Sequence, residues 1–108
     1  MDDRTTIRVL KALAHPKRFQ MVEKVADAGE LCCGAIGECF EVAQPTISHH
    51  LKILGDAGVL KARREAQRAF ISVDTALLEE VFDSIRDRLS ARSPVRTKKT
   101  RKVAVRAR

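Results

Sequence analysis

The spacing of apolar residues changes twice along this chain, and this limits the possible folds more than any other feature of the sequence. Up to Gly58, apolar residues recur at the spacing of an amphipathic helix. Over residues 59–73 they alternate roughly with period two, as in a half-buried hairpin, and after Asp74 the helical spacing returns. The hairpin tip, near residues 65–67, lacks Asn-Gly or Asp-Gly, so we expect a loop longer or looser than a tight turn.

Prolines and glycines divide the helical part into short segments. Pro16 and Pro45 each suit the first turn of a helix, where the missing N–H costs nothing, and Gly29 can end one. Asp74 or Thr75 can cap the last helix. The sequence therefore predicts a mainly α fold of about five helices with a small two-stranded hairpin. The expected helices cover residues 5–14, 16–29, 33–40, 45–55 or 45–58, and a segment after residue 74.

The formal net charge of +7 comes from one end of the chain. Residues 92–108 contain eight Lys or Arg and no acidic residue, so residues 1–91 carry 13 basic against 14 acidic side chains. We therefore expect one folded domain, residues 1–92, and a disordered basic tail, residues 93–108. Within the domain, bases exceed acids between Gln44 and Ser72. Such a local patch can attract a nucleic acid.

Neither the start of the chain nor its cysteines suggest export. The opening residues, MDDRTT, carry acids where a secretory signal would carry bases, and no apolar run is long enough to cross a bilayer. The three cysteines are an odd number and two are adjacent, which does not suit paired disulfides. We expect a soluble cytoplasmic protein with reduced thiols and no association with membranes.

The predicted fourth helix has one apolar and one polar face. Advancing about 100° per residue places two sets on opposite sides: Ile47, Leu51 and Leu54 on one, and Ser48, His49 and Lys52 on the other. Short polar groups beside a cation suit the major groove of DNA, where donors and acceptors read base edges and cations bind phosphates. His50 lies at the edge of the apolar side, so it either packs beneath the helix or contacts DNA.

Three segments of the sequence match one family in order and spacing. The run QPTISHHLKILGDAGVL is preceded by LKALAHPKRFQMV and followed by KARREAQRAFISV. The chain resembles the ArsR/SmtB family of winged helix-turn-helix repressors over most of residues 9–73. The resemblance implies a homodimer joined through its first and last helices. It places the fourth helix in the major groove of double-stranded DNA, and the hairpin, residues 61–73, as a wing against the adjacent backbone or minor groove.

The same resemblance implies which side chains touch DNA. On the fourth helix they are Gln44, Thr46, Ser48, His49 and Lys52, and on the wing they are Arg63, Arg64, Gln67 and Arg68.

An apolar stripe on the last helix has two possible partners. Its members are Leu78, Val81 or Phe82, Ile85 and Leu89, at a spacing close to that of a coiled-coil seam. The stripe can pack into the core of its own subunit or against a second copy of the chain. Because the domain is small, we favour a dimer interface shared with Ile7 and Leu10. A symmetric dimer predicts a two-fold symmetric operator with half-sites about one helical turn apart, or a multiple of it.

The cysteines are candidates for sensing an effector. Many members of the family repress until a thiophilic metal ion binds, and one version carries Cys-x-Cys after Glu-Leu. Here Cys32 follows Glu-Leu, but Gly34 stands at the second cysteine position. Cys33 and Cys39 could supply further thiolates for As(III), Sb(III) or another thiophilic metal ion. On one straight helix, Cys32 and Cys39 would be about 10 Å apart, too far to share an ion. A three-thiolate site therefore needs a helix that begins after Cys33 and bends, or a sulfur from the second subunit.

Two other readings of the cysteines stay open. They can react with an oxidant, or they can have no sensing role, with Cys39 as a small core residue and the adjacent pair in a loop.

We interpret the chain as a transcriptional repressor that is released from DNA by a thiol-reactive effector. The alternatives are a thiol-redox-responsive or effector-independent repressor, and an architectural protein that binds nucleic acid without specificity through its tail. No catalytic residue is predicted. Ser48, His49 and His50 have no acid placed to orient a histidine, and the sequence has no Gly-rich phosphate loop.

Overall fold

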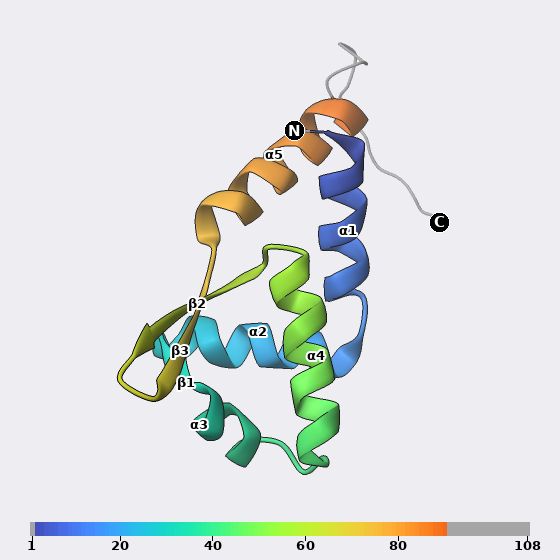
Figure 1. Cartoon of the computed structure of the whole chain (residues 1–108). Helices are drawn as coiled ribbons and strands as arrows, with labels where there is room; N and C mark the ends of the chain where they lie inside the picture. The colour runs from blue at the N-terminus through green and yellow to red at the C-terminus, as the bar shows by residue number, and fades with distance from the viewer. Residues whose placement is uncertain (1, 91–108) are drawn as a thin grey trace.

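The computed structural model describes residues 2–90, which form five α-helices and three β-strands (Figure 1). In chain order these are α1 Asp3–Leu13, α2 Pro16–Ala28, β1 Leu31–Cys32, α3 Cys33–Glu38, α4 Gln44–Asp56, β2 Leu60–Glu65, β3 Arg68–Val73 and α5 Thr75–Ser90. The prediction of a mainly α fold with five helices and a hairpin before the last one is confirmed.

The predicted basic tail, residues 93–108, lies outside the described residues. Within residues 2–90, none of the helices has both the length and the apolar character that crossing a bilayer requires.

Capping residues and a proline explain where the helices begin. His15 caps α2, because its Nδ1 accepts a hydrogen bond from the Lys17 N–H at 3.1 Å, and Pro16 occupies the first position of that helix. Asp74 caps α5 by accepting from the Leu77 N–H at 3.1 Å. Each cap satisfies a backbone donor that the first turn of a helix leaves without a partner. These boundaries therefore follow from local sequence.

The sheet is antiparallel with the strand order β1-β3-β2, one strand more than the sequence predicted. In β1, Leu31 and Cys32 pair with Ile71 and Phe70 of β3. A strand of two residues is too short to show an alternating pattern, so nothing in the periodicity indicates it. Its effect is to attach the segment that leads into α3 to the hairpin.

The tip of the hairpin is tighter than predicted. The two strands pair as far as Glu65 and Arg68, which leaves only Ala66 and Gln67 in the turn. Ala66 has φ 58°, in the left-handed region, which costs an L-residue about 1–2 kcal/mol. The expectation of a longer or looser loop was therefore wrong. The turn takes up the positive φ of a tight hairpin without a glycine or asparagine.

One apolar core lies between the helices and the sheet. Its largest fully buried side chains are Val9, Met21, Val25, Ile36, Ile47, Leu54, Val59 and Val81. Ile47 and Leu54 fix the inner side of α4 in this core, whereas Val81 is the one buried residue among those described for α5. In Figure 1, α5 runs back from the hairpin to lie beside α1.

Gly58 connects α4 to the hairpin where a side chain would not fit. Its φ of 85° lies in the region that favours glycine. A Cβ added there would lie 2.9 Å from Cδ2 of Leu77, in the first turn of α5. Gly58, just after α4, therefore lies close to the first turn of α5.

Candidate nucleic-acid interface

Helix α4 has one side in the core and the other in solvent. Ile47 and Leu54 are completely buried, and His50 is 7% exposed. The five residues that the family resemblance placed in the major groove are all exposed: Gln44, Thr46, Ser48, His49 and Lys52. The helix thus presents hydroxyl, amide, imidazole and ammonium groups outward while its apolar side is held inside the subunit. This arrangement suits a helix that enters a groove and reads base edges.

His50 lies on the buried side of α4, which decides between packing and DNA contact, the two roles that the sequence left open. Its ring centroid lies 4.7 Å from that of His15, and its Nδ1 lies 3.4 Å from Nη1 of Arg18. Burial lowers the pKa of His50, because an imidazolium there would lose hydration, and the nearby positive charges of His15 and Arg18 lower it further. His50 is therefore a neutral packing residue near pH 7 rather than a DNA contact.

Arg18 fastens the end of α1 to this cluster. Its Nε donates to the backbone carbonyl of Ala12 at 2.7 Å and its Nη2 donates to that of Lys11 at 3.3 Å. Both carbonyls are in the last turn of α1, and that of Lys11 also accepts from the Ala14 N–H at 3.2 Å. Arg18 therefore links the α1–α2 junction to His50 of α4.

Lys52 is engaged in an ion pair that the sequence analysis did not consider. Its Nζ lies 3.2 Å from Oδ2 of Asp56, one turn further along α4. Both side chains are largely exposed, so the pair contributes little stability and can exchange its partner for a phosphate. The four-residue spacing is a readable helical signal, and it could have identified Asp56 from the sequence.

The cations of the wing differ in their surroundings. Lys61, Arg64 and Arg68 are exposed, and none of them takes part in an ion pair within residues 2–90. Arg63, in contrast, donates from Nε and Nη2 to both carboxylate oxygens of Glu30, at 3.1 and 2.8 Å. The two residues are 33 positions apart in sequence, so no spacing rule would have paired them.

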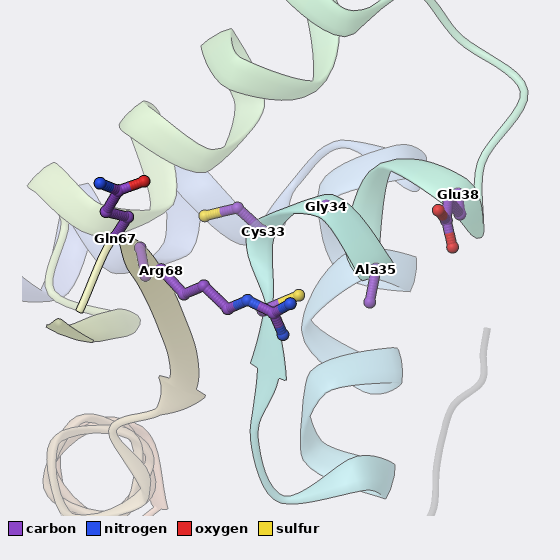
Figure 2. A pocket seen from close by; sticks show the side chains of 8 residues that line it. Cys33, Gly34, Ala35, Glu38, Gln67 and Arg68 are labelled. Atoms are coloured by element: carbon purple, nitrogen blue, oxygen red, sulfur yellow. The ribbon is translucent and has the colours of Figure 1, made fainter. Parts of the chain in front are cut away.

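Cys32 and Cys33 line a surface hollow of about 450 Å³ between α3 and the tip of the hairpin. Figure 2 shows Arg68 extending from β3 toward the start of α3, with Cys33 and Gln67 nearby. Cys32 is the last residue of β1 and Cys33 the first of α3, so the pair lies at a strand–helix junction rather than in a loop. Both thiols therefore line the same hollow as Gln67 and Arg68, two of the predicted DNA-contact residues.

Cys39 lies elsewhere on the surface. It is exposed rather than part of the core, and it lines a second hollow beside Glu23, Lys24 and Phe40. No group of three or more His, Cys, Asp or Glu within residues 2–90 could hold a metal ion. Helix α3 begins at Cys33 rather than after it, and one subunit does not assemble Cys32, Cys33 and Cys39 into a three-thiolate site. A site that uses a sulfur of the second subunit stays a prediction.

An apolar surface runs over α1 and α5. Four of the six predicted dimer residues are exposed: Ile7 by 49%, Leu10 by 37%, Phe82 by 43% and Leu89 by 80%. The other two, Leu78 and Ile85, are partly buried against the core of their own subunit. The stripe on α5 therefore divides between the two roles that the sequence left open. Its inner members support the core and its outer members face solvent.

Comparison with known proteins gives consistent matches. Residues 15–62 match the family described as "Bacterial regulatory protein, arsR family". An uncharacterized HTH-type transcriptional regulator of Methanocaldococcus jannaschii is 36% identical over 74 residues, which cover 68% of this chain and 83% of the relative. The transcriptional repressor SdpR of Bacillus subtilis is 35% identical over 72 residues, covering 67% of this chain and 79% of the relative.

Solved structures share the same fold. One is the homodimeric winged helix-turn-helix DNA-binding domain of a possible ArsR-family transcriptional regulator from Mycobacterium bovis, determined in solution. It superposes with a TM-score of 0.62 at 30% identity, covering 82% of this chain and 90% of the other.

Proposed function

The chain belongs to the arsR family of bacterial regulatory proteins, and we propose that it represses transcription in the cytoplasm as a homodimer that reads duplex DNA with α4. The observation that carries this proposal is the two-sided burial of α4. Ile47 and Leu54 are fully buried while Ser48, His49 and Lys52 are exposed on the opposite side. A helix fixed in this way presents its polar groups at a constant height above the domain, as base readout requires.

The exposed apolar surface of α1 and α5 supports the dimer. Phe82 and Leu89 would lose contact with water if a second copy of the chain packed its own α1 and α5 against them. An ion pair between Arg88 and Asp3 holds the outer end of α5 to the beginning of α1, so both helices offer one continuous face. A two-fold dimer formed through this face would require an operator with two-fold symmetry.

Contacts to the phosphate backbone are assigned to the cations that have no fixed partner. Arg64 and Arg68 on the wing are exposed, and Lys52 on α4 is held only by an exposed ion pair. Such contacts position a protein on the duplex and make binding salt-dependent, but they carry no sequence information. Base specificity is assigned to Gln44, Thr46, Ser48 and His49 on α4, with Gln67 at the tip of the wing.

Substitutions on α4 test these roles. Lys52→Ala should weaken binding to every duplex, whereas Ser48→Ala and His49→Ala should change the preference at particular bases by about 1–3 kcal/mol. The measurement is selection of bound sequences from a randomised duplex library, followed by titration of individual duplexes. Lys24→Ala on α2, which removes an exposed charge away from the interface, is the matched control.

Equal losses on every duplex for all three α4 variants would contradict the role assignment. Loss of all DNA binding on deleting residues 93–108 would instead favour the architectural alternative, in which the tail does the binding.

A thiol-reactive effector is a second part of the proposal, supported by the hollow that contains Cys32 and Cys33. Arg68 and Gln67 line the same hollow, so a group bound to the thiols would occupy space beside the wing. With As(III), two thiols would each replace a hydroxide on arsenic and release water, and a third ligand would come from solvent or the second subunit. An oxidant acting on the same thiols is the alternative chemistry.

Titration with arsenite, antimonite or hydrogen peroxide while following DNA release tests the effector. Release should be abolished in a Cys32→Ser, Cys33→Ser variant and retained in Cys39→Ser. Release that is equal in all three proteins would exclude the cysteine pair as the sensor.

A further inference from the structure

Arg63 is held by carboxylates of its own subunit. Its Nε and Nη2 donate to the two oxygens of Glu30 at 3.1 and 2.8 Å, and its Nη1 lies 3.4 Å from Oε1 of Glu65. All three guanidinium nitrogens are therefore next to negative charge. A fork of two parallel N–H···O bonds is the geometry with which arginine also binds a phosphate. A phosphate could bind Arg63 with this geometry only by displacing Glu30.

An aromatic ring fixes the side chain of Arg63 in this position. Arg63 of β2 stands opposite Phe70 of β3, which in turn stands opposite Cys32 of β1. Directly opposed residues share one face of a sheet, and the guanidinium carbon of Arg63 lies 4.8 Å from the centre of the Phe70 ring. The side chain thus crosses the sheet from β2 over β3 to reach Glu30, just before β1. Stacking of this kind holds the plane of an arginine in place.

These contacts distinguish the pair from an ordinary surface ion pair. Isolated exposed pairs contribute little, because two mobile side chains must be ordered to form them. Here the ring already orders Arg63, and a second carboxylate supports it. The hydrogen bonds from Arg63 lower the pKa of Glu30, and those to Glu30 and Glu65 raise the pKa of Arg63. Both groups are therefore fully ionised across the pH range in which the protein would bind DNA.

The neighbouring cation on the same strand lies in a different environment. Successive side chains of a strand point to opposite faces, so Arg64 points away from Glu30. Arg64 is exposed and makes no ion pair within the part of the chain that the structure describes. Two adjacent arginines of one wing are thus in opposite states, one engaged by the protein and one available.

We propose that Glu30 is a positioning residue that withholds Arg63 from DNA, so that the wing contacts phosphates through Arg64 while Arg63 stays bound to Glu30. This inference rests on the proposed function, in which α4 and the wing bind duplex DNA. The family resemblance gave Arg63 the role of a DNA contact. In this proposal its charge is instead neutralised by Glu30 of the same subunit.

The salt dependence of DNA binding tests the proposal. Each phosphate contact adds about 0.9 to the steepness of a plot of log Kobs against log salt concentration. The plot would be measured by fluorescence anisotropy on full-length protein and a mixed-sequence duplex long enough for both subunits. Glu30→Gln should steepen it by about 0.9 for each subunit bound. Arg63→Ala should leave it unchanged in the wild-type background and should cancel the increase in the Glu30→Gln background.

Two controls fix the scale of these changes. Arg64→Ala should make the plot shallower by about 0.9 for each subunit, since it removes a real contact. Glu23→Gln on α2 removes the same charge as Glu30→Gln at an exposed position away from the wing, and it should match the wild type. Circular dichroism melting of each variant confirms that it is folded, and Glu30→Ala repeats the loss of the carboxylate without an amide in its place.

Three results would overturn the proposal while leaving DNA binding intact. Arg63→Ala alone could make the plot shallower, as Arg64→Ala does. Glu30→Gln and Glu30→Ala could give the same plot as Glu23→Gln, or they could bind DNA more weakly than the wild type. If the folded wild-type protein bound no duplex at any salt concentration, the proposed function would fail together with the inference.

Discussion

Helices α4 and α5 are both amphipathic, but they dispose of their apolar sides differently. In α4, Ile47 and Leu54 are completely buried, and Leu51 and Ile53 are partly buried against the core. In α5 only Val81 is buried among the residues described, while Phe82 and Leu89 remain exposed by 43% and 80%. The outer side of α4 is polar, whereas the outer side of α5 carries large apolar groups.

The subunit itself covers the largest apolar side chains of α4, but it leaves two large apolar side chains of α5 in contact with solvent. Large apolar side chains exposed on one helix are candidates for contact with another protein. The same stripe pattern in the sequence can therefore serve the fold in one helix and association in the other. Substitutions in the two helices should act on different measured quantities.

The largest expected effect lies on the inner side of α4. Leu54→Ala should lower the free energy of unfolding by about 3 kcal/mol, because it removes apolar contacts and leaves a cavity in a close-packed core. Urea unfolding followed by circular dichroism would measure this loss. Lys52→Ala, on the outer side of the same helix, should change stability by less than about 0.5 kcal/mol. A loss below about 1 kcal/mol for Leu54→Ala would mean that α4 is not anchored as described.

The next largest effect concerns association through α5. Phe82→Asp should raise the dissociation constant of the dimer at least about tenfold, because it places a charge in a contact that must exclude water. Sedimentation equilibrium would measure the change.

Phe19 provides a matched control for that variant. It is 50% exposed on α2, away from the α1–α5 surface, so Phe19→Asp makes the same change at a similar exposure. Phe19→Asp should leave the dimer intact. Equal dissociation of the two variants would contradict the assignment of the dimer interface to α5.

The smallest effect is the pH dependence contributed by His50, the buried ionisable group of α4. Its pKa in the folded protein is lower than the ordinary value of 6.5, since burial and the nearby His15 and Arg18 disfavour the imidazolium. The unfolded chain therefore binds a proton more readily. His50 should not reduce the free energy of unfolding above pH 6.5. Below pH 6.5 that free energy should fall as the pH drops, by at most about 1.4 kcal/mol per pH unit.

Substitution of neighbouring histidines isolates this contribution. His50→Gln should flatten the fall in the free energy of unfolding below pH 6.5, as measured by urea titration at a series of pH values. His49→Gln changes an exposed neighbour on the same helix and should retain the fall. If His49→Gln flattened the profile and His50→Gln did not, the burial assigned to His50 would be contradicted.

Features that depend on neighbours along the chain were accessible from the sequence. The five helices, the cap at Asp74 and the outward side of α4 follow from periodicity and from local hydrogen bonding. The family assignment was also accessible, because it depends on runs of consecutive residues.

Features that depend on distant pairing were not accessible. Strand β1 has only Leu31 and Cys32, and it exists because β3 offers a free edge. The ion pair of Arg63 with Glu30 needs the three-stranded sheet to bring positions 33 residues apart together. The separation of Cys39 from Cys32 was expected from their spacing on a helix, but the two different surface hollows that they line depend on how α3 packs against the hairpin and α2.

The close approach at Gly58 has a practical consequence for engineering this protein. A Cβ at that position would meet Cδ2 of Leu77 at 2.9 Å, in a backbone conformation that L side chains rarely adopt. A cysteine or a labelled residue placed there would strain the backbone and displace the Leu77 side chain. Lys24, which is exposed on α2, offers a site for such probes outside the residues assigned to DNA binding.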